Sequence, residues 1–273
     1  MKNFYLLLLS TFMLVLSCRA EDDPVVTDEQ TLSQMKADVF YPGAVPYDNS
    51  ALFFKFEYNS KQQLTRKAGG FLPASGSTGG LRYFSDKIYT SFSYNGIQIT
   101  AENKSSSADF TVQPEKRMYL LDQNNRIVEK EIPHTNSYLV AKQTFVYDGD
   151  RLIEIKTTYP NMPYDPNDPD DYIETWLEKF TYDDGNNLIK TENVQLHNSK
   201  PAGIRIVRTF GNYDTAKNVC KSLFLLEDLM YRSLSANNYR NYSEEEFWFN
   251  ELQSSKTQSW TFNYDSNGQV IIN

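Results

Sequence analysis

Four aspartates lie close together in one segment and carry the oxygen ligands that a Ca²⁺ site needs. Asp165, Asp168, Asp170 and Asp171 fall within a short span, and Ca²⁺ prefers carboxylate and carbonyl oxygens. The segment has no glycine at a sharp turn and no glutamate at the twelfth position, and its two prolines favour an extended chain. We predict a solvated insertion here, with calcium binding as the alternative.

The two histidines predict no zinc site, because His134 and His197 are far apart and neither has a His or Cys partner at a zinc-motif spacing. The chain also lacks a Gly-x-Ser-x-Gly motif, a phosphate-binding glycine loop and a dinucleotide fingerprint. We therefore expect no catalytic activity and no cofactor. The alternative is a hydrolase whose acidic residues meet only in the folded protein.

Aromatic residues are abundant enough to supply a stacking surface for a sugar ring: the chain has 19 Tyr, 17 Phe and three Trp. Trp248 lies between two phenylalanines, and side chains alternate along a strand, so its ring points away from both neighbours. Trp248 is therefore the candidate ligand-binding residue. Trp176 and Trp260 are expected in the core, and the acidic run at residues 244–246 is expected to be solvated rather than catalytic.

A repeated sequence unit positions these candidate residues. An aromatic residue, any residue, Tyr or Leu, and then Asp or Asn occur in this order six times, at residues 56–59, 92–95, 119–122, 145–148, 180–183 and 262–265, with a degenerate copy at 210–214. Two large side chains at i and i+2 share one face of a strand, and Asp, Asn and Gly reverse the chain. An aliphatic residue then opens a return strand: Leu64, Ile99, Ile127, Leu152, Leu188 or Val270. Each unit is predicted to be a β-hairpin.

The repeat predicts an all-β domain over residues 33–273, folded as a curved antiparallel β-meander of repeated hairpins with one apolar and one wet face. One helix is expected from about residue 218 to about residue 236, packed on the sheet. Its apolar residues follow helical spacing: Leu223, Leu226, Leu229, Met230 and Leu234.

The first 17 residues predict export, because a lysine precedes an apolar stretch that is too short to span a membrane. The run Val-Leu-Ser-Cys that ends at Cys18 resembles the bacterial lipoprotein cleavage site, with Val15 where the strict form has leucine. Residues 1–17 are therefore predicted to be a lipoprotein signal peptide, and Cys18 the lipid attachment site. The alternative is an ordinary secretory signal with a chance cysteine.

Residues 18–32 are expected to be an acidic tether, because three consecutive acids precede a polar, proline-containing stretch. Cys220 is the other cysteine, and its Leu-rich surroundings predict a small buried hydrophobe. With Cys18 bearing lipid, no intramolecular disulfide is expected.

The charge balance argues against nucleic acid as a partner. The chain has 27 Lys and Arg against 35 Asp and Glu, giving a formal net charge of -8. An acidic surface repels the phosphate backbone that supplies most of the affinity in such complexes. A hydrophobic content of 40% also excludes intrinsic disorder.

The repeat, the pair Asn237-Asn238 after the expected helix and the closing hairpin at residues 264–268 resemble a group of Bacteroidetes surface lipoproteins. These are built from YD-type repeats, related in pattern to the tyrosine-aspartate repeats of the large bacterial Rhs shells. The chain departs from the pattern at Leu121, where Tyr is missing, and at Tyr213, where the spacing is one residue longer. The resemblance implies a lipid-anchored protein on the outer membrane, exposed at the cell surface, without an established biochemical activity.

We therefore expect a noncatalytic surface lipoprotein that acts as a scaffold or binds a glycan, a peptide or a neighbouring surface protein. A carrier or receptor for a hydrophobic ligand is an alternative, because a curved sheet with an aromatic inner face and one helix can enclose a cavity. A filled interior would exclude the carrier.

Overall fold

The computed structural model describes residues 31–37, 52–73, 82–112 and 115–271. The predicted signal peptide, Cys18 and most of the predicted tether lie outside these residues. Thr31–Asn273 form one compact unit, which contains the whole of the predicted β domain.

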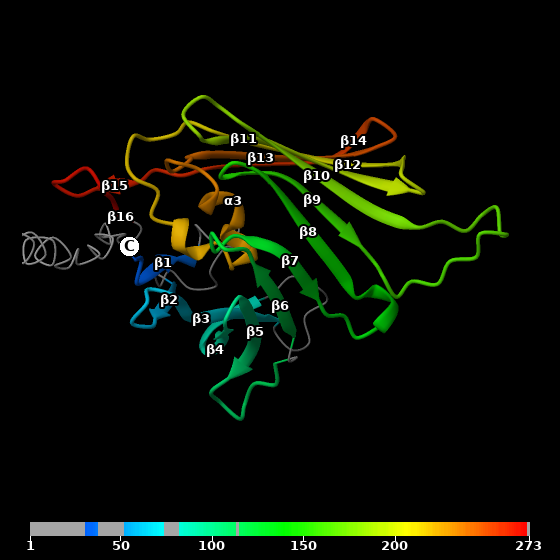
Figure 1. Ribbon diagram of the computed structural model, residues 1–273. Coiled ribbons are helices and arrows are strands. Elements are labelled where there is room, and N and C mark those ends of the chain that lie inside the picture. Colours follow the sequence, from blue (N-terminus) through cyan, green and yellow to red (C-terminus); the bar gives the residue numbers. More distant parts are fainter. Residues whose placement is uncertain (1–30, 38–51, 74–81, 113–114, 272–273) are drawn as a thin grey trace, which may run out of the picture. The chain divides into compact units, whose positions relative to one another are not determined.

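In the described residues, fourteen strands form one antiparallel sheet in which each strand pairs with the next along the chain (Figure 1). The strands are β1 (Gln34–Lys36), β2 (Phe53–Tyr58), β3 (Leu64–Pro73), β4 (Arg82–Asn95), β5 (Gln98–Ser105), β6 (Lys116–Leu121), β7 (Ile127–Ile132), β8 (Ala141–Asp148), β9 (Arg151–Thr158), β10 (Glu174–Tyr182), β11 (Leu188–His197), β12 (Lys200–Gly211), β13 (Asn241–Trp248) and β14 (Glu251–Ser259). β15 (Asn263–Tyr264) and β16 (Val270–Ile271) form a separate hairpin. The prediction of an all-β antiparallel meander is confirmed.

The repeated sequence units are hairpins, as predicted. The five units from residue 56 to residue 188 form the pairs β2–β3, β4–β5, β6–β7, β8–β9 and β10–β11, and the last unit forms β15–β16. The first aromatic of each unit is buried: Phe56, Phe92, Tyr119, Phe145, Phe180 and Phe262. The degenerate copy differs, because Phe210 ends up in β12 and the chain then leaves the sheet before β13.

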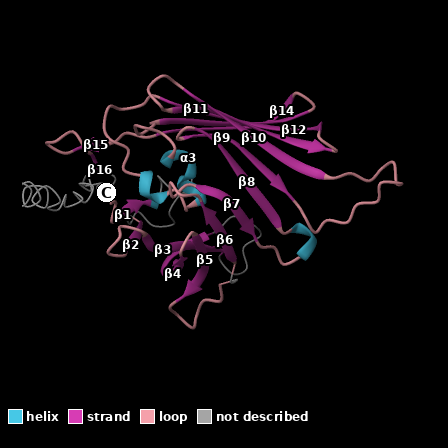
Figure 2. Cartoon of the chain, in the orientation of Figure 1, coloured by secondary structure: helices cyan, strands magenta, loops and turns pink. Residues whose placement is uncertain are grey.

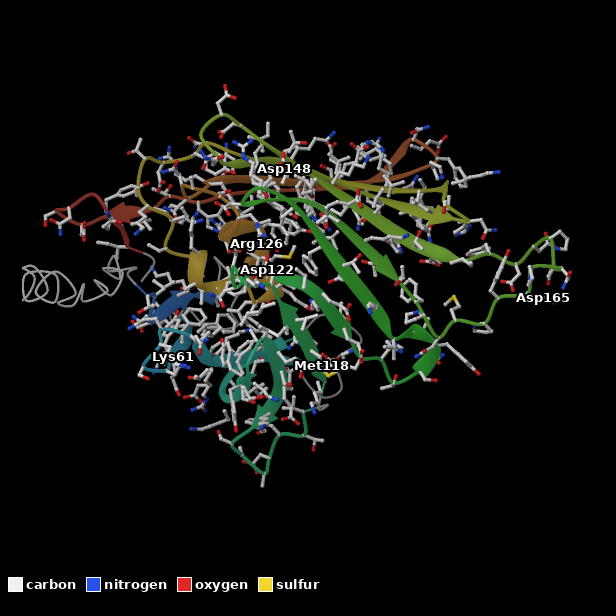
Figure 3. The ribbon with its side chains drawn as sticks, viewed as in Figure 1. Lys61, Met118, Asp122, Arg126, Asp148 and Asp165 are labelled. Atoms are coloured by element: carbon white, nitrogen blue, oxygen red, sulfur yellow. The ribbon has the colours of Figure 1, made fainter. Side chains whose placement is uncertain are left out.

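The acidic or amide residue of the repeat closes its turn with side-chain hydrogen bonds. Asp122 Oδ1 accepts from the backbone amides of Asn124 (2.8 Å) and Arg126 (2.9 Å), and Asn125 has a φ of 59°. Arg126 also donates from Nε to Asp122 Oδ2 (2.8 Å), and the two side chains lie together at the turn (Figure 3). Asn59 and Asp265 accept the equivalent pair of backbone amides. This residue therefore sets the hairpin geometry locally.

The second aromatic of the repeat links each unit to the preceding part of the chain. Tyr94 donates its hydroxyl to the carbonyl of Leu64 (2.8 Å), the residue that opens the return strand of the preceding unit. The same bond runs from Tyr147 to Ile127 (2.9 Å), from Tyr182 to Leu152 (3.1 Å) and from Tyr213 to Leu188, and Tyr58 donates to Leu32 (2.9 Å). We call Tyr58, Tyr94, Tyr147, Tyr182 and Tyr213 the tyrosine ladder. Leu121 interrupts it, because leucine has no hydroxyl.

Removing one ladder hydroxyl is expected to cost about 1 kcal/mol of unfolding free energy. In Tyr94→Phe the ring stays packed, but the Leu64 carbonyl loses its hydrogen bond. Urea denaturation measures the difference. Tyr138→Phe is the matched control, because the side chain of Tyr138 is 53% exposed and should give the wild-type midpoint; equal midpoints for both variants would contradict the role of the ladder.

The one late helix that the sequence predicts is present, but it is short, so its predicted extent over residues 218–236 is wrong. The segment contains two 3-10 turns, η2 (Lys221–Leu223) and η3 (Glu227–Leu229), followed by the four-residue helix α3 (Met230–Ser233), and helical elements are short throughout Figure 2. Another 3-10 turn, η1 (Ser137–Leu139), lies between β7 and β8. No helix in the described residues is long and apolar enough to cross a membrane. We call residues 218–236 the cap.

Burial on several sides explains why the cap departs from a helix. Leu226 has an extended backbone (φ -89°, ψ 118°) that separates η2 from η3. Asn218 Nδ2 donates to the carbonyls of Arg232 (2.6 Å) and Ser235 (2.7 Å), so a side chain satisfies groups that a continuous helix would pair internally. Of the leucines that suggested a helical stripe, Leu223, Leu226 and Leu229 are nevertheless buried and Leu234 is half-buried. The spacing therefore predicted burial of most of them, but it predicted the wrong backbone conformation.

The cap packs on the face of the sheet that carries the repeat aromatics, which we call the inner face (Figure 1). Tyr119 donates its hydroxyl to the Leu225 carbonyl (3.1 Å), and the backbone amide of Leu188 donates to Ser235 Oγ (3.1 Å). Cys220 is 1% exposed, as predicted for a small buried hydrophobe, and burial raises the pKa of its thiol to about 11. The cap leucines therefore occupy the space in which a hydrophobic ligand would have to lie.

Candidate functional site

Polar side chains follow the repeat aromatics on the inner face: at the next position along each strand that faces this side, most residues are polar. In β3, β4 and β5, Lys67, Thr90 and Asn103 are direct cross-strand neighbours. A second in-register run crosses β7 to β11 and consists of Lys130, Gln143, Thr157, Trp176 and Gln195. Side chains two residues apart in a strand point to the same face of the sheet. Thr90 therefore points to the inner face, because it precedes the buried Phe92 by two residues. We call these eight residues the polar row.

A cleft of about 220 Å³ opens at one end of the polar row, between β3–β6 and the cap. Its lining residues are Lys67, Thr90, Phe92, Asn103, Arg117, Leu225, Leu226, Glu227 and Asp228. Thr90 Oγ1 (2.9 Å) and Arg117 Nη2 (3.1 Å) both donate to Asn103 Oδ1. Arg117 Nε is buried without a hydrogen-bond partner. We call this site the charged cleft.

Positive charge exceeds negative charge around the charged cleft. Arg117 Nη1 lies 3.6 Å from Glu227 Oε2, and Lys130 Nζ forms an ion pair with Glu227. With Lys67 and Asp228, three cations face two carboxylates, although the chain as a whole is acidic. Burial lowers the pKa of Lys67 to about 8, with Asp228 acting in the opposite direction. Lys67 is therefore still mainly protonated at neutral pH.

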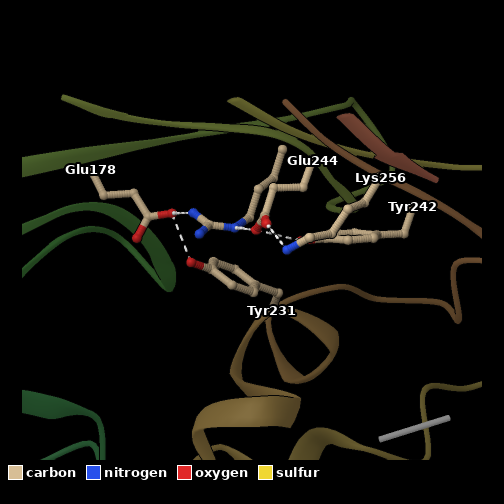
Figure 4. Close-up of polar contacts among 6 residues, drawn as sticks. Glu178, Tyr231, Tyr242, Glu244 and Lys256 are labelled. Atoms are coloured by element: carbon tan, nitrogen blue, oxygen red, sulfur yellow. Dashed lines mark hydrogen bonds and ion pairs between the residues drawn. The ribbon is translucent and has the colours of Figure 1, made fainter. Parts of the chain in front are cut away.

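A second set of charged groups on the inner face joins the sheet to the cap (Figure 4). Arg208 donates to Glu178 Oε1 (3.2 Å) and to Glu244 Oε2 (2.8 Å). Tyr231 of the cap donates to the same Glu178 oxygen (2.9 Å). Lys256 donates to Glu244 Oε1 (3.0 Å). One guanidinium therefore holds two carboxylates, and we call this set the Arg208 cluster.

The Arg208 cluster does not have the properties of a hydrolase site. Burial alone would raise the pKa of Glu244, but the charges of Arg208 and Lys256 hold it below its usual range. A glycosidase needs one carboxyl that stays protonated as a general acid. The cluster instead leaves both carboxylates in ion pairs, which favours a structural role.

The acidic run at residues 244–246 is not simply solvated, and this interpretation needs correction. Alternation along β13 places Glu244 and Glu246 on the inner face and Glu245 on the outer face. Glu244 belongs to the Arg208 cluster, and Glu246 Oε1 accepts from Trp248 Nε1 (2.9 Å).

Trp248 is 50% exposed, so the prediction of an exposed ring is confirmed. Trp248 shares the inner face with Tyr242, which packs on the core ring of Phe210. Because Trp248 is six residues after Tyr242 in β13, it lies roughly 20 Å from Tyr242 along the strand. Trp176 is also on the inner face but only half-buried, and its Nε1 donates to Glu174 Oε1 (2.8 Å). The core prediction is wrong for Trp176, because it lies beyond the packed aromatics, whereas Trp260 packs on Tyr239 as expected.

The Asp-rich segment is an exposed loop with Asp165 at its far tip (Figure 3). Its carboxylates accept hydrogen bonds from the loop's own backbone: Asp165 from Asn167 (2.9 Å), Asp168 from Asp170 (2.9 Å), and Asp171 from Asp165 (2.7 Å). Within the described ranges, no three His, Cys, Asp or Glu residues come together to hold a metal ion.

The two histidines are also separate in the structure. The ring of His197 stacks on Tyr172 with centroids 3.5 Å apart, and His134 Nδ1 accepts from the backbone amide of Asn136 (3.0 Å). Neither residue belongs to the charged cleft or to the Arg208 cluster.

Sequence reasoning missed the charged residues of the inner face, although the repeat contains a signal for them. The residue two positions before the first aromatic of a unit is polar in five copies: Thr90, Arg117, Gln143, Glu178 and Arg208. This position faces the same side of the strand as the aromatic. A polar residue there therefore indicated a polar inner surface beside the core.

Comparisons with known proteins find similar structures but no similar family. No protein-family model and no curated protein matches the chain. Among solved structures, a porin-like protein from Bacteroides uniformis has a TM-score of 0.48 and 13% identity, over 83% of this chain and 84% of that one. A porin-like protein from Bacteroides vulgatus has a TM-score of 0.49 and 11% identity, over 88% of this chain and 90% of that one.

Proposed function

We propose that this protein is a noncatalytic, lipid-anchored protein of the outer-membrane surface that binds a glycan along its inner face. The observation that carries the proposal is Trp248, a half-exposed ring that lies on the inner face beyond the packed aromatics. Sugars offer an apolar ring face for stacking and hydroxyl groups for hydrogen bonds, so their sites combine aromatic rings with a few polar groups.

The neighbours of Trp248 supply the polar part of such a site. Glu246 accepts a hydrogen bond from Nε1 of the Trp248 indole. The cross-strand neighbour of Trp248 on β12 is Ile204. Farther across the sheet, Asn193 pairs with Ile206 and has a buried Oδ1 without a hydrogen-bond partner. Gln195 is the cross-strand neighbour of Trp176. The amide side chains of β11 thus lie on a strand between the two tryptophans, an arrangement that suits an extended chain of sugars.

The location in this proposal is supported by the sequence of residues 1–32. A signal peptide that ends at Cys18 would leave a lipid-bearing N-terminus, and the acidic stretch after it would act as the tether. The anchor would then hold the β domain close to the glycans of the cell surface.

Truncating Trp248 is expected to weaken glycan binding about 30-fold. A buried tryptophan anchor contributes about 2 kcal/mol to binding, and Trp248→Phe should keep part of it because an aromatic face remains. The measurement is binding of the mature chain, from Cys18 onward in detergent, to a glycan array, followed by titration of the best ligand.

Phe249→Ala is the matched control for this titration, because Phe249 is the next residue and is 81% exposed at the hairpin turn. It should bind like the wild type. Absence of any bound glycan, or equal affinity for wild type and Trp248→Ala, would refute the proposed function.

A further inference from the structure

Two tryptophans on the inner face are held in the same way. Trp176 donates from Nε1 to Glu174 Oε1 (2.8 Å), and Trp248 donates from Nε1 to Glu246 Oε1 (2.9 Å). In each pair the glutamate precedes the tryptophan by two residues of the strand, so both side chains share a face. Both rings keep accessible surface, since Trp248 is half-exposed and Trp176 is half-buried. The hydrogen bond orients each indole before a ligand arrives, which lowers the entropy cost of binding.

The register of the sheet places the two rings in one line across the strands. Four residues on β10, β11, β12 and β13 are direct cross-strand neighbours: Glu178, Asn193, Ile206 and Glu246. Trp176 is two residues beyond Glu178, and Trp248 is two residues beyond Glu246 in the same direction, because β10 and β13 run antiparallel to each other. Three strand spacings of about 4.8 Å separate the two positions, so they lie about 14 Å apart.

The distance and the twist between the two tryptophans indicate a ligand made of linked rings. Adjacent strands rotate by roughly 20–25°, so the surroundings of the two indoles differ in direction by roughly 60–75°. A rigid planar ligand could not lie flat on both indoles. An oligosaccharide can, because each sugar presents an apolar face and the bonds between sugars rotate. The oligosaccharide must also be long enough to reach from one indole to the other.

The charges around the two rings favour an uncharged ligand. Three carboxylates flank the rings: Glu174, Glu246 and Glu251. Lys200, at the tip of the β11–β12 hairpin, is a cation on the same face, and the cations of the Arg208 cluster are already paired with Glu178 and Glu244. A ligand carboxylate would meet like charge, which disfavours binding. Sugar hydroxyls, in contrast, can donate to the carboxylate oxygens.

We propose that Trp176 is a second stacking residue of the glycan site, and that this site selects uncharged linear glycans that reach both tryptophans. The inference rests on the proposed glycan-binding function and specifies the class of the glycan and its minimum length. Gln195 is the cross-strand neighbour of Trp176, and Ile204 is that of Trp248. The middle sugars would therefore contact an amide and an apolar side chain.

Length dependence tests the second stacking residue. The mature chain is titrated with neutral glucans of α and β linkage, from the disaccharide to the octasaccharide. The wild type should bind the longest glucan at least about ten-fold more tightly than the disaccharide, because the second contact becomes intramolecular. Trp176→Ala should abolish this gain, and Trp176→Phe, which keeps an aromatic ring, should retain part of it. Leu177→Ala is the matched control: Leu177 is the next residue of β10, its side chain faces the other side of the sheet, and the gain should remain.

The same glucans with their primary hydroxyls oxidised to carboxylates test the charge selectivity. The oxidised glucans should bind at least about ten-fold more weakly than the neutral ones at low salt, and the difference should shrink as salt is added. Glu174→Gln combined with Glu246→Gln should reduce the difference, while the amide oxygens can still accept from the two indoles.

The outcomes separate this inference from the proposed function. Absence of binding to every neutral glucan, no gain with length, a gain that survives in Trp176→Ala, or oxidised glucans that bind as tightly as neutral ones would each overturn the inference. The proposed function is read independently, from binding of any glycan on the array and from the effect of Trp248→Ala on the best ligand found there.

Discussion

Arg208→Met is expected to lower the free energy of unfolding by about 3–5 kcal/mol, the usual cost of leaving a buried charge without its partner. Glu178 is 8% exposed and would keep only the Tyr231 hydroxyl from the cluster. Glu244 would keep Lys256 and Tyr242. Chemical denaturation followed by circular dichroism measures the loss.

Two further variants show whether the buried charges are responsible. Arg205→Met changes a neighbouring arginine of β12 whose ion pair with Glu192 is partly exposed on both sides, and it should cost less than about 1 kcal/mol. Adding Glu178→Gln and Glu244→Gln to Arg208→Met should recover part of the loss, because no unpaired carboxylate remains. A similar cost for Arg205→Met and Arg208→Met would refute this account of the Arg208 cluster.

Raising the pH from 10 to 12 is expected to unfold the protein. Burial raises the pKa of Tyr58, Tyr94 and Tyr147 from about 10 to about 12, and it raises the pKa of Tyr182 and Tyr213 as well. Between these values the folded state keeps protons that the unfolded state has lost. Stability from these tyrosines is thus complete below pH 10 and declines as the pH rises through the folded pKa.

The size of this effect follows from the shifts. One pKa unit corresponds to about 1.4 kcal/mol, so three ladder tyrosines whose pKa rises from about 10 to about 12 would together account for about 8 kcal/mol. These side chains are partly exposed to solvent, which reduces the contribution to about 6 kcal/mol. That is comparable with the whole stability of a typical domain, about 5–15 kcal/mol. Circular dichroism against pH, with tyrosinate absorbance recorded in parallel, measures it. Tyr94→Phe should show a shallower decline above pH 10, and a steep ionisation that precedes unfolding would contradict the prediction.

The hairpins could be predicted from the sequence because they depend on short-range features. Two rings at i and i+2 must share a face, and an Asp such as Asp122 binds amides two and four residues later in the chain. The ladder was not predicted, although its tyrosines were recognised, because its bonds reach across units. Tyr147, for example, binds a carbonyl 20 residues away.

The cap and the candidate site could not be predicted in the same way. Most leucines of the cap are buried, and a helical spacing does not reveal that Asn218 bonds carbonyls far along the segment. The charged cleft depends on which strands become neighbours and on where the cap lies. Arg117 and Glu227 come together only through that packing.

The tyrosine ladder has a consequence for how such a chain changes in evolution. Each rung joins a hairpin to the segment before it, so the sheet is held together by nearest-neighbour bonds, much as in a solenoid. Duplication of one hairpin away from the cap would bring its own turn, its own rung and one more strand pair. Descendants of such a chain would then differ in length by whole hairpins, with longer or shorter ligand surfaces built on an unchanged architecture.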